Sequence, residues 1–178
     1  MNIFVLDEDP IKAARMMCDK HIPKMVVETA QMMASALRRH GATDDVMPLT
    51  QKGTPYKGGY HHHPCTVWAG DSRNNYLWLL HHGLTLSAEY LKRFHRMHTC
   101  HAPIYDMGEL FNMIPAGGMT PFARAFNKET YPFLYDEEQY TAVEAYRAYY
   151  SLDKARFAEW NKGTPAPSWW DNKKMVIQ

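Results

Sequence analysis

Four side chains able to take part in bond-making chemistry lie close together near the start of the sequence: Lys20, His21, Lys24 and Glu28. Their spacing of three and four residues brings them to one side of a helix, because a helix completes a turn every 3.6 residues. An amine beside a carboxylate is the pair that imine chemistry or cleavage of a glycosidic bond uses. The pattern predicts a catalytic cluster, with an inert, solvent-exposed Lys–Glu pair as the alternative.

A second set of residues could bind a substrate. His63 precedes Pro64 at a predicted helix start, where its ring could face a phosphate at the helix N-terminus or simply act as an N-cap. Aromatic side chains can stack on exposed bases and basic ones can contact phosphates, although both are also common in cores and at helix ends. The predicted substrate-binding residues are His63, Trp68, Asn75, Arg73, Lys92, Arg96 and Tyr60.

The histidines and cysteines do not form a recognisable metal motif. The run at 61–63, together with His81 and His82, matches none of the HExxH or CxxC spacings of zinc sites, so we expect no metal and no cofactor. An odd number of cysteines argues against the disulfide framework of a secreted protein and favours a reducing cytoplasm. The three cysteines are Cys18, Cys65 and Cys100.

Length and charge restrict the classes of protein further. The 178 residues, 46% of them hydrophobic, suffice for one domain with a sizeable core, which we expect to span 1–178. Lys and Arg total 20 against 19 for Asp and Glu, so any contact with nucleic acid must come from a local basic patch. No window approaches the roughly 18 apolar residues of a membrane span, and no membrane partner is expected.

The predicted catalytic cluster depends on helical structure near the N-terminus. The apolar run at 2–6 predicts a short, buried, extended arm. Asp7 or Asp9 is expected to cap a helix that begins at Pro10, because proline at the first helical position has no amide to waste. Pro23 then either kinks this helix or opens a new one.

The predicted binding residues depend on later elements. A Gly- and Pro-rich stretch at 41–61 predicts a long loop, and the longest helix is expected to end near Arg96. Asp136 is expected to cap another helix, and 163–178 to form an extended tail whose Trp169–Trp170 pair folds back onto the body. We therefore predict a mainly α, single-domain bundle of five to six helices. The buried side of the longest helix is predicted to comprise Leu77, Leu80, Leu84, Ala88, Leu91 and Phe94, with His81 and His82 opposite.

Two resemblances follow from longer stretches of sequence. MNIFVLDEDPIKAARMMCDKHIPKMVVETAQMM, HHHPCTVWAGDSRNNYLWLLHHGL and GGMTPFARAF resemble a family of uncharacterised proteins of tailed bacteriophages. Residues 2–98 also resemble the pyrimidine-dimer DNA glycosylases of the phage endonuclease V type. The similarity lies in the order of the parts. A short N-terminal arm is followed by a helix with polar residues ahead of IPKM, by the basic helix end ALRRHG, and by HPCTVWAG before a long helix that ends EYLKRFHR. The most suggestive positions are His63–Pro64 and Trp68.

The second resemblance implies a small, all-α DNA repair enzyme and a particular chemistry. Those glycosylases attack the sugar with an N-terminal α-amine exposed by removal of methionine, whereas the size of Asn2 predicts that Met1 is retained here. Their essential glutamate falls at His21 in this resemblance, two turns before Glu28. The resemblance thus leaves Lys20, Lys24 and the Met1 terminus as candidate amines, and Glu28 and Asp19 as candidate carboxylates.

The resulting hypothesis is a phage-encoded hydrolase that acts on DNA or nucleotides in the host cytoplasm. Its reaction would be N-glycosylase- or lyase-like, on damaged or modified pyrimidines, with a flipped base and an aromatic side chain in the gap. A non-catalytic protein that sequesters a nucleotide uses the same inventory of Lys, Arg, His and aromatic residues and remains the alternative. A structural or host-interaction protein is a third interpretation.

Overall fold

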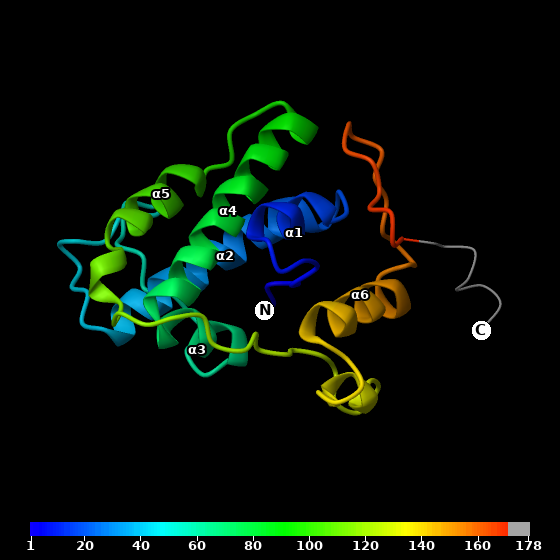
Figure 1. The fold of residues 1–178 in the computed structure, drawn as a ribbon. Coiled ribbons are helices and arrows are strands. Elements are labelled where there is room, and N and C mark those ends of the chain that lie inside the picture. Colours follow the sequence, from blue (N-terminus) through cyan, green and yellow to red (C-terminus); the bar gives the residue numbers. More distant parts are fainter. Residues whose placement is uncertain (171–178) are drawn as a thin grey trace.

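Two long helices, α2 (His21–Arg39) and α4 (Arg73–Phe94), form the centre of the fold (Figure 1). The structure, a computed structural model, describes residues 1–170. This part of the chain contains no strand, and the predicted mainly α, single-domain bundle of five to six helices is confirmed. The remaining elements are α1 (Pro10–Met16), α3 (Pro64–Asp71), α5 (His101–Glu109), α6 (Ala142–Asp153) and two 3-10 helices, η1 (Phe111–Met113) and η2 (Pro132–Tyr135).

The N-terminal region divides into two helices. Asp9 caps α1, because its carboxylate accepts hydrogen bonds from the amides of Ile11 and Lys12. A break follows Met16, and α2 begins at His21. Pro23 lies in the first turn of α2, where its missing N–H leaves no intrahelical bond unmade. Of the two predicted effects of this proline, the opening of a new helix is the observed one.

The predicted buried side of α4 is only partly right: Leu80, Leu84 and Phe94 are partly buried against the core. Ala88 and Leu91 are exposed, whereas His82 is fully buried. The helix packs against α1, α2, α3 and α5, so several of its faces are covered and a single leucine stripe does not describe its burial. Polar residues such as Asn75 and Arg93 are buried because they find hydrogen-bond partners there.

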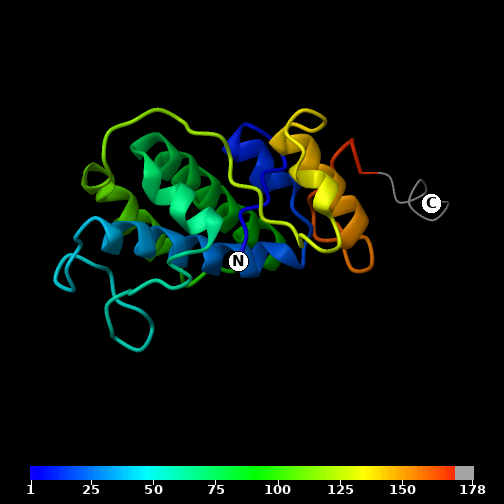
Figure 2. The same cartoon turned by 90° about the horizontal axis from the view of Figure 1, so that it is seen from below.

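The N-terminal arm and α6 lie against each other. The arm is buried, as predicted, and in Figure 2 the chain begins beside α2. Arg147 of α6 donates to the carbonyl of Leu6 at 2.8 Å, which ties the two segments together. The predicted cap at Asp136 is wrong: Thr141 caps α6 in a capping box with Glu144.

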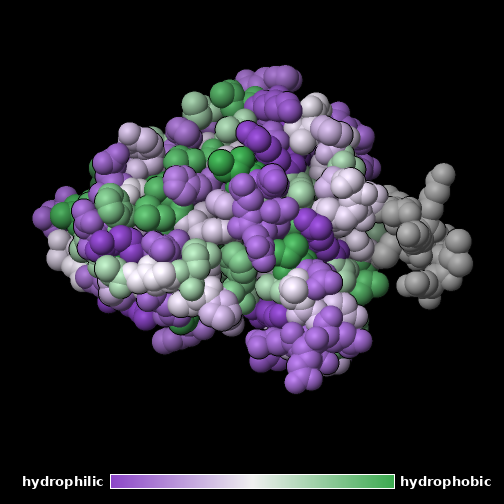
Figure 3. Space-filling view, viewed as in Figure 1, coloured by the Kyte–Doolittle hydropathy of each residue, from purple (hydrophilic) through white to green (hydrophobic). Residues whose placement is uncertain are grey.

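The surface mixes hydrophilic and hydrophobic residues (Figure 3), and hydrophilic ones gather over the loop that lies below α6. The predicted loop at 41–61 is confirmed and joins α2 to α3. The Trp169–Trp170 pair folds back onto α6, with both rings packed edge-on against Tyr150. Residues 163–168 of the predicted tail contain no helix or strand, and residues 171–178 lie outside the described residues. Among residues 1–170, no helix has the length and apolar character needed to cross a membrane.

Candidate active site

Glu28, on α2, lies against the start of the chain. Its Oε1 accepts a hydrogen bond from the amide of Asn2 at 3.0 Å and lies 3.2 Å from the α-amine of Met1. The second oxygen, Oε2, is buried and has no hydrogen-bond partner among the described residues. Leaving a buried polar atom unpaired costs about 1–3 kcal/mol, so the unpaired carboxylate oxygen beside an amine is a feature that calls for an explanation, and a catalytic role is one.

The arm that holds this amine is fixed by its own side chains. Asn2 Oδ1 accepts from the amides of Ile3 and Phe4, and Asn2 Nδ2 donates to the carbonyl of Ala125 at 2.9 Å. Phe4 adopts the left-handed region, with φ +57°, which turns the chain so that its ring stacks on His21. The amine is therefore presented on a rigid support.

His21 packs against this N-terminal arm. Its ring lies 4.7 Å from that of Phe4, and Nδ1 lies 2.9 Å from the hydroxyl of Tyr150. Burial, together with smaller contributions from the nearby Lys154 and Lys24, lowers the pKa of His21 to about 3. The ring is neutral near pH 7, and it holds the arm instead of facing a cavity.

Met1 lines two neighbouring cavities. The first, of about 400 Å³, is also lined by Lys24, Val27, Glu28, Gln31 and Tyr60. The second, of about 500 Å³, is also lined by Asn2, His63, Pro64, Arg124, Ala125, Phe126, Lys128, Tyr135 and Tyr149. The residue that carries the amine thus lines both cavities.

Tyr60 stands at the rim of the first cavity. It is 67% exposed and has a φ of +52°, a strained conformation for an aromatic residue. The loop before it is pinned to α2, since the Ser35 hydroxyl donates to the carbonyl of Gly59 and accepts from its amide, both at 2.9 Å. Gly58 has a φ of +80°, and a Cβ there would lie 2.2 Å from Ser35 Oγ, so only glycine permits this contact.

His63 caps α3 and faces the second cavity. Its Nδ1 accepts from the amide of Cys65 at 3.1 Å, which makes Nε2 the protonated nitrogen of the neutral ring. Burial lowers the pKa of His63, and the α-amine of Met1 lowers it further. The N-cap interpretation of this residue holds, and the same residue lies within electrostatic reach of the amine.

The structure brings Lys24, Glu28, Tyr60 and His63 together around Met1, and it puts the other predicted site residues elsewhere. Lys20 is exposed at the start of α2, with Nζ 4.5 Å from the centre of the Phe157 ring. Trp68 is buried, and Asn75 donates to its carbonyl at 2.8 Å.

The three basic residues predicted on α4 have other surroundings. Arg73 donates to the carbonyls of Ile114 and Asn112. Lys92 lines a separate cavity with Arg15, and Arg96 donates to the hydroxyl of Tyr90 at 2.7 Å. None of the three lines a cavity beside Met1.

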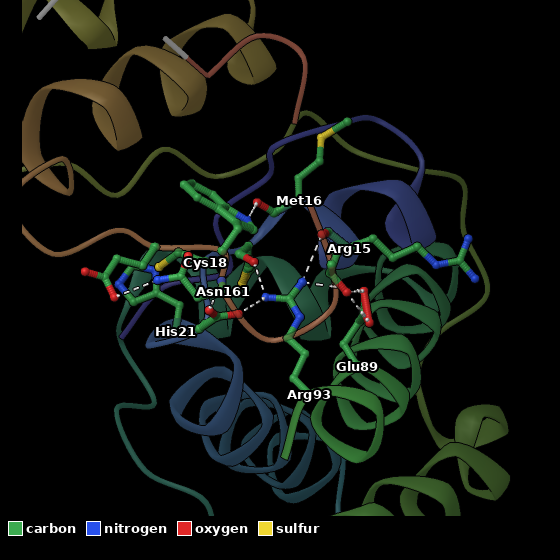
Figure 4. Close-up of polar contacts among 12 residues, drawn as sticks. Arg15, Met16, Cys18, His21, Glu89, Arg93 and Asn161 are labelled. Atoms are coloured by element: carbon green, nitrogen blue, oxygen red, sulfur yellow. Dashed lines mark hydrogen bonds and ion pairs between the residues drawn. The ribbon is translucent and has the colours of Figure 1, made fainter. Parts of the chain in front are cut away.

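The other candidate carboxylate, Asp19, pairs with Arg93, and Figure 4 shows the buried network around Arg93 with Glu89 and Asn161. Asp19 Oδ1 lies 3.2 Å from Arg93 and its Oδ2 accepts from the amide of Asn161 at 2.7 Å. Arg93 also pairs with Glu89 at 3.5 Å, and Thr164 donates to Glu89. Both oxygens of Asp19 are engaged, so it has no free acceptor for a reaction.

Sequence reasoning missed the aromatic wall of the second cavity. Phe126, Tyr135 and Tyr149 lie about a hundred residues beyond Glu28, and their spacing carries no periodic signal. Their only sequence signal is the density of aromatic residues between 122 and 150.

The comparisons with known proteins give one match. The sequence model of the family described as pyrimidine dimer DNA glycosylase matches residues 1–102. This range includes Met1, Glu28, Tyr60 and His63, and it ends before the aromatic wall. Neither the curated proteins nor the solved structures contain a match to the chain.

Proposed function

The chain belongs to the pyrimidine dimer DNA glycosylase family, and on that premise we propose that it cleaves the base–sugar bond of a pyrimidine lesion in DNA with the α-amine at the start of the chain. The observation that carries this proposal is the contact of 3.2 Å between that amine and Glu28, whose other oxygen is buried and unpaired. An amine next to a proton acceptor is the requirement for nucleophilic attack by nitrogen.

The proposed reaction begins with a proton transfer. Glu28 takes a proton from the ammonium group, and the freed nitrogen lone pair attacks C1′ of the sugar. The new N–C1′ bond forms as the C1′–base bond breaks, and the base leaves with the bonding electrons and is then protonated. Loss of a proton from the attacking nitrogen and opening of the sugar ring give an imine, which water hydrolyses or borohydride reduces.

Two nitrogens satisfy this geometry. The Met1 amine and the Asn2 nitrogen lie 3.2 and 3.0 Å from the same Glu28 oxygen. If Met1 is retained, its amine is the nucleophile; if it is removed, the new amine of Asn2 starts beside the same carboxylate. Mass spectrometry of the intact protein distinguishes the two forms.

Three neighbouring residues have supporting roles in this proposal. Lys24, exposed at the rim of the first cavity, contributes positive charge for a phosphate of the DNA strand. Tyr60, rigidly presented and exposed, stacks in the space left by a displaced base. His63 Nε2 donates a hydrogen bond into the second cavity.

Borohydride trapping tests the proposal. With a duplex that contains one thymine dimer or one abasic site, reduction should link the protein to DNA, and peptide mapping should locate the link at residue 1 or 2. A link at Lys20 or Lys24 would contradict the assignment of the amine. If nothing is trapped on either duplex and the protein instead releases an unchanged nucleotide on denaturation, nucleotide binding without chemistry is the function.

A further inference from the structure

The N-terminal arm that carries the amine, residues 2–7, belongs to no helix or strand. Among the described residues, the only backbone-to-backbone hydrogen bond of this arm joins the amide of Leu6 to the carbonyl of Phe4, at 2.8 Å. A buried segment without a ladder of such bonds must find partners for its backbone among side chains. The position of the arm therefore depends on side chains, including those of neighbouring elements.

One of these elements is α6, and the start of the chain lies between it and the central helices (Figure 1). Arg147 Nε donates to the carbonyl of Leu6 at 2.8 Å, and Arg147 Nη2 donates to Oδ2 of Asp7 at 3.2 Å. The guanidinium group is planar and its donors have fixed directions. Contacts to two consecutive residues therefore fix both the position and the direction of the chain at the end of the arm.

The ring of Phe4 is held by the same part of the chain. Its centroid lies 5.5 Å from that of Tyr150, edge-on, and 6.3 Å from that of Tyr149, in a stacked arrangement. Lys154, which directly follows α6, has its Nζ 5.7 Å from the centre of the Phe4 ring. A left-handed residue such as Phe4, with φ +57°, keeps that conformation only where its surroundings impose it, and these contacts do so.

The contacts of the arm continue as far as the amine. Asn2 Oδ1 accepts from the amides of Ile3 and Phe4, and the amide of Asn2 donates to Glu28 at 3.0 Å. The α-amine of Met1 follows, 3.2 Å from the same carboxylate oxygen. A reacting group must be held within about 0.5 Å of its productive position, so a looser arm should move the amine away from Glu28.

From these contacts we propose that Arg147 is a positioning residue, which holds the arm so that the α-amine stays beside Glu28. The inference rests on the proposed function, because it takes this amine as the nucleophile. Arg147 lines neither cavity beside Met1, so it acts through the arm and not on the substrate there. The proposal places one requirement of the reaction on α6, beyond the matched range of 1–102.

Hydrogen exchange, measured by NMR, tests the placement of the arm without any chemistry. In Arg147→Met the amides of Ile3 and Phe4 should exchange about 10-fold faster, because the arm opens more often, while α2 and α4 keep their protection. Methionine retains an apolar stem at this partly exposed position, so the variant should fold. Arg156→Met, which removes an equal charge from an exposed position, is the matched control and should leave the arm unchanged.

A kinetic double-mutant cycle tests the consequence for the amine. With saturating abasic duplex and borohydride quenching at timed intervals, Arg147→Met should form the imine about 10–10²-fold more slowly, the cost of a misplaced reacting group. Its affinity for the duplex should equal that of Arg156→Met. Glu28→Gln should slow the Arg147→Met variant much less than it slows the parent, because an amine that has left Glu28 no longer depends on that carboxylate.

The outcomes separate this inference from the proposed function. Arm amides that exchange at the parent rate in Arg147→Met, or additive effects of the two substitutions, would overturn the positioning role. A loss of affinity at an unchanged rate would also overturn it, and would make Arg147 a contact to DNA. If the parent itself traps no DNA, the proposed chemistry fails, and the exchange of the arm amides alone then decides whether Arg147 holds the arm.

Discussion

Two buried carboxylates close to one another in sequence, Asp19 and Glu28, have opposite surroundings. Asp19 uses both oxygens, one toward Arg93 and one toward the amide of Asn161, in a network with no free acceptor on that carboxylate. Glu28 uses only Oε1, leaves Oε2 unpaired, and has a cavity of about 400 Å³ in front of it. Asp19 also lines a cavity, of about 630 Å³, so space alone does not separate the two. The first arrangement joins segments of the fold, and the second has an unpaired acceptor beside an amine.

Burial and charge do not by themselves identify an active site. The Arg93 network connects α4 with the end of α1 and with residues 159–164, since Arg93 also donates to the carbonyls of Met17 and Arg15. Both terminal nitrogens of Arg93 and both oxygens of Asp19 have partners, although Arg93 Nε has none among the described residues, and a buried network of this kind stabilises one arrangement of the chain. An amine, a carboxylate oxygen without a partner, and adjoining space together distinguish the region around Glu28.

The largest expected effect is on activity at Glu28. Glu28→Gln keeps the shape and an acceptor oxygen but cannot take up the proton, so the single-turnover rate on a thymine-dimer duplex should fall by about 10²–10⁴-fold, the range of general acid–base catalysis. Melting of the variant, followed by circular dichroism, checks that it folds. A rate within 3-fold of the parent would remove Glu28 from the mechanism.

In the Arg93 network we expect a loss of stability instead of a loss of activity. Arg93→Met leaves Asp19 and Glu89 buried without their cation, and the free energy of unfolding should fall by about 3–5 kcal/mol. Urea denaturation measures this loss. Lys92→Met, at the exposed neighbouring position, is the control and should change stability by less than about 0.5 kcal/mol. Equal losses in the two variants would contradict a structural role for the network.

A smaller effect is expected at the rim of the site. Tyr60→Ala removes a ring that we propose to stack in DNA, and one base–aromatic stack is worth about 1–3 kcal/mol, so excision should slow by roughly 10-fold. Because the ring is 67% exposed, melting should stay unchanged. Tyr105→Ala, at a 55% exposed position of α5, should affect neither quantity. A slower Tyr105 variant would indicate a general effect of lost aromatic surface.

A different kind of effect, the dependence of stability on pH, sharpens the comparison with a buried group that lines none of the cavities described above. Both ring nitrogens of His82 lack partners among the described residues, and burial lowers its pKa to about 3. His21 has a similarly lowered pKa. Between pH 3 and 6.5 the unfolded chain therefore binds more protons at these rings than the folded chain does. Stability should be fully present above pH 6.5 and fall as the pH drops, by up to about 1.4 kcal/mol per pH unit for each ring.

Replacing His82 tests that explanation. In His82→Leu the slope of unfolding free energy between pH 6.5 and 4.5 should fall by up to about 1.4 kcal/mol per pH unit, because the contribution of His82 is lost. His21, His63 and His98, whose pKa values are also lowered by burial, still contribute. Urea titrations at several pH values give the slope. Activity at pH 7.5 should not change, because the buried His82 ring lines neither cavity beside Met1 and so does not contact the substrate. An unchanged slope would show that His82 is not the source of the pH dependence.

Local chemistry explains why parts of the fold were predictable. Asp9, one of the two predicted caps, caps α1, and the Gly- and Pro-rich loop at 41–61 follows from its composition. The buried faces of α4 were not predictable from a leucine stripe, because four neighbouring helices cover it and buried polar residues are paired across them.

The candidate site was predictable only in part, for a similar reason. The sequence identifies Lys24 and Glu28 as residues of one helical face, and it identifies His63 as the start of a helix. It cannot show that the arm returns Met1 to Glu28, because that depends on the hydrogen bonds of Asn2 and the left-handed turn at Phe4.

Borohydride trapping with identification of the linked residue tests the central claim most directly. The protein is mixed with duplex DNA that contains one abasic site, reduced, digested and analysed by tandem mass spectrometry. The assignment of the nucleophile predicts one adduct, on the α-nitrogen of Met1 or of Asn2, and its loss when the α-amine is blocked by acetylation. An adduct on a lysine side chain, or trapping that survives the blocked amine, would contradict it.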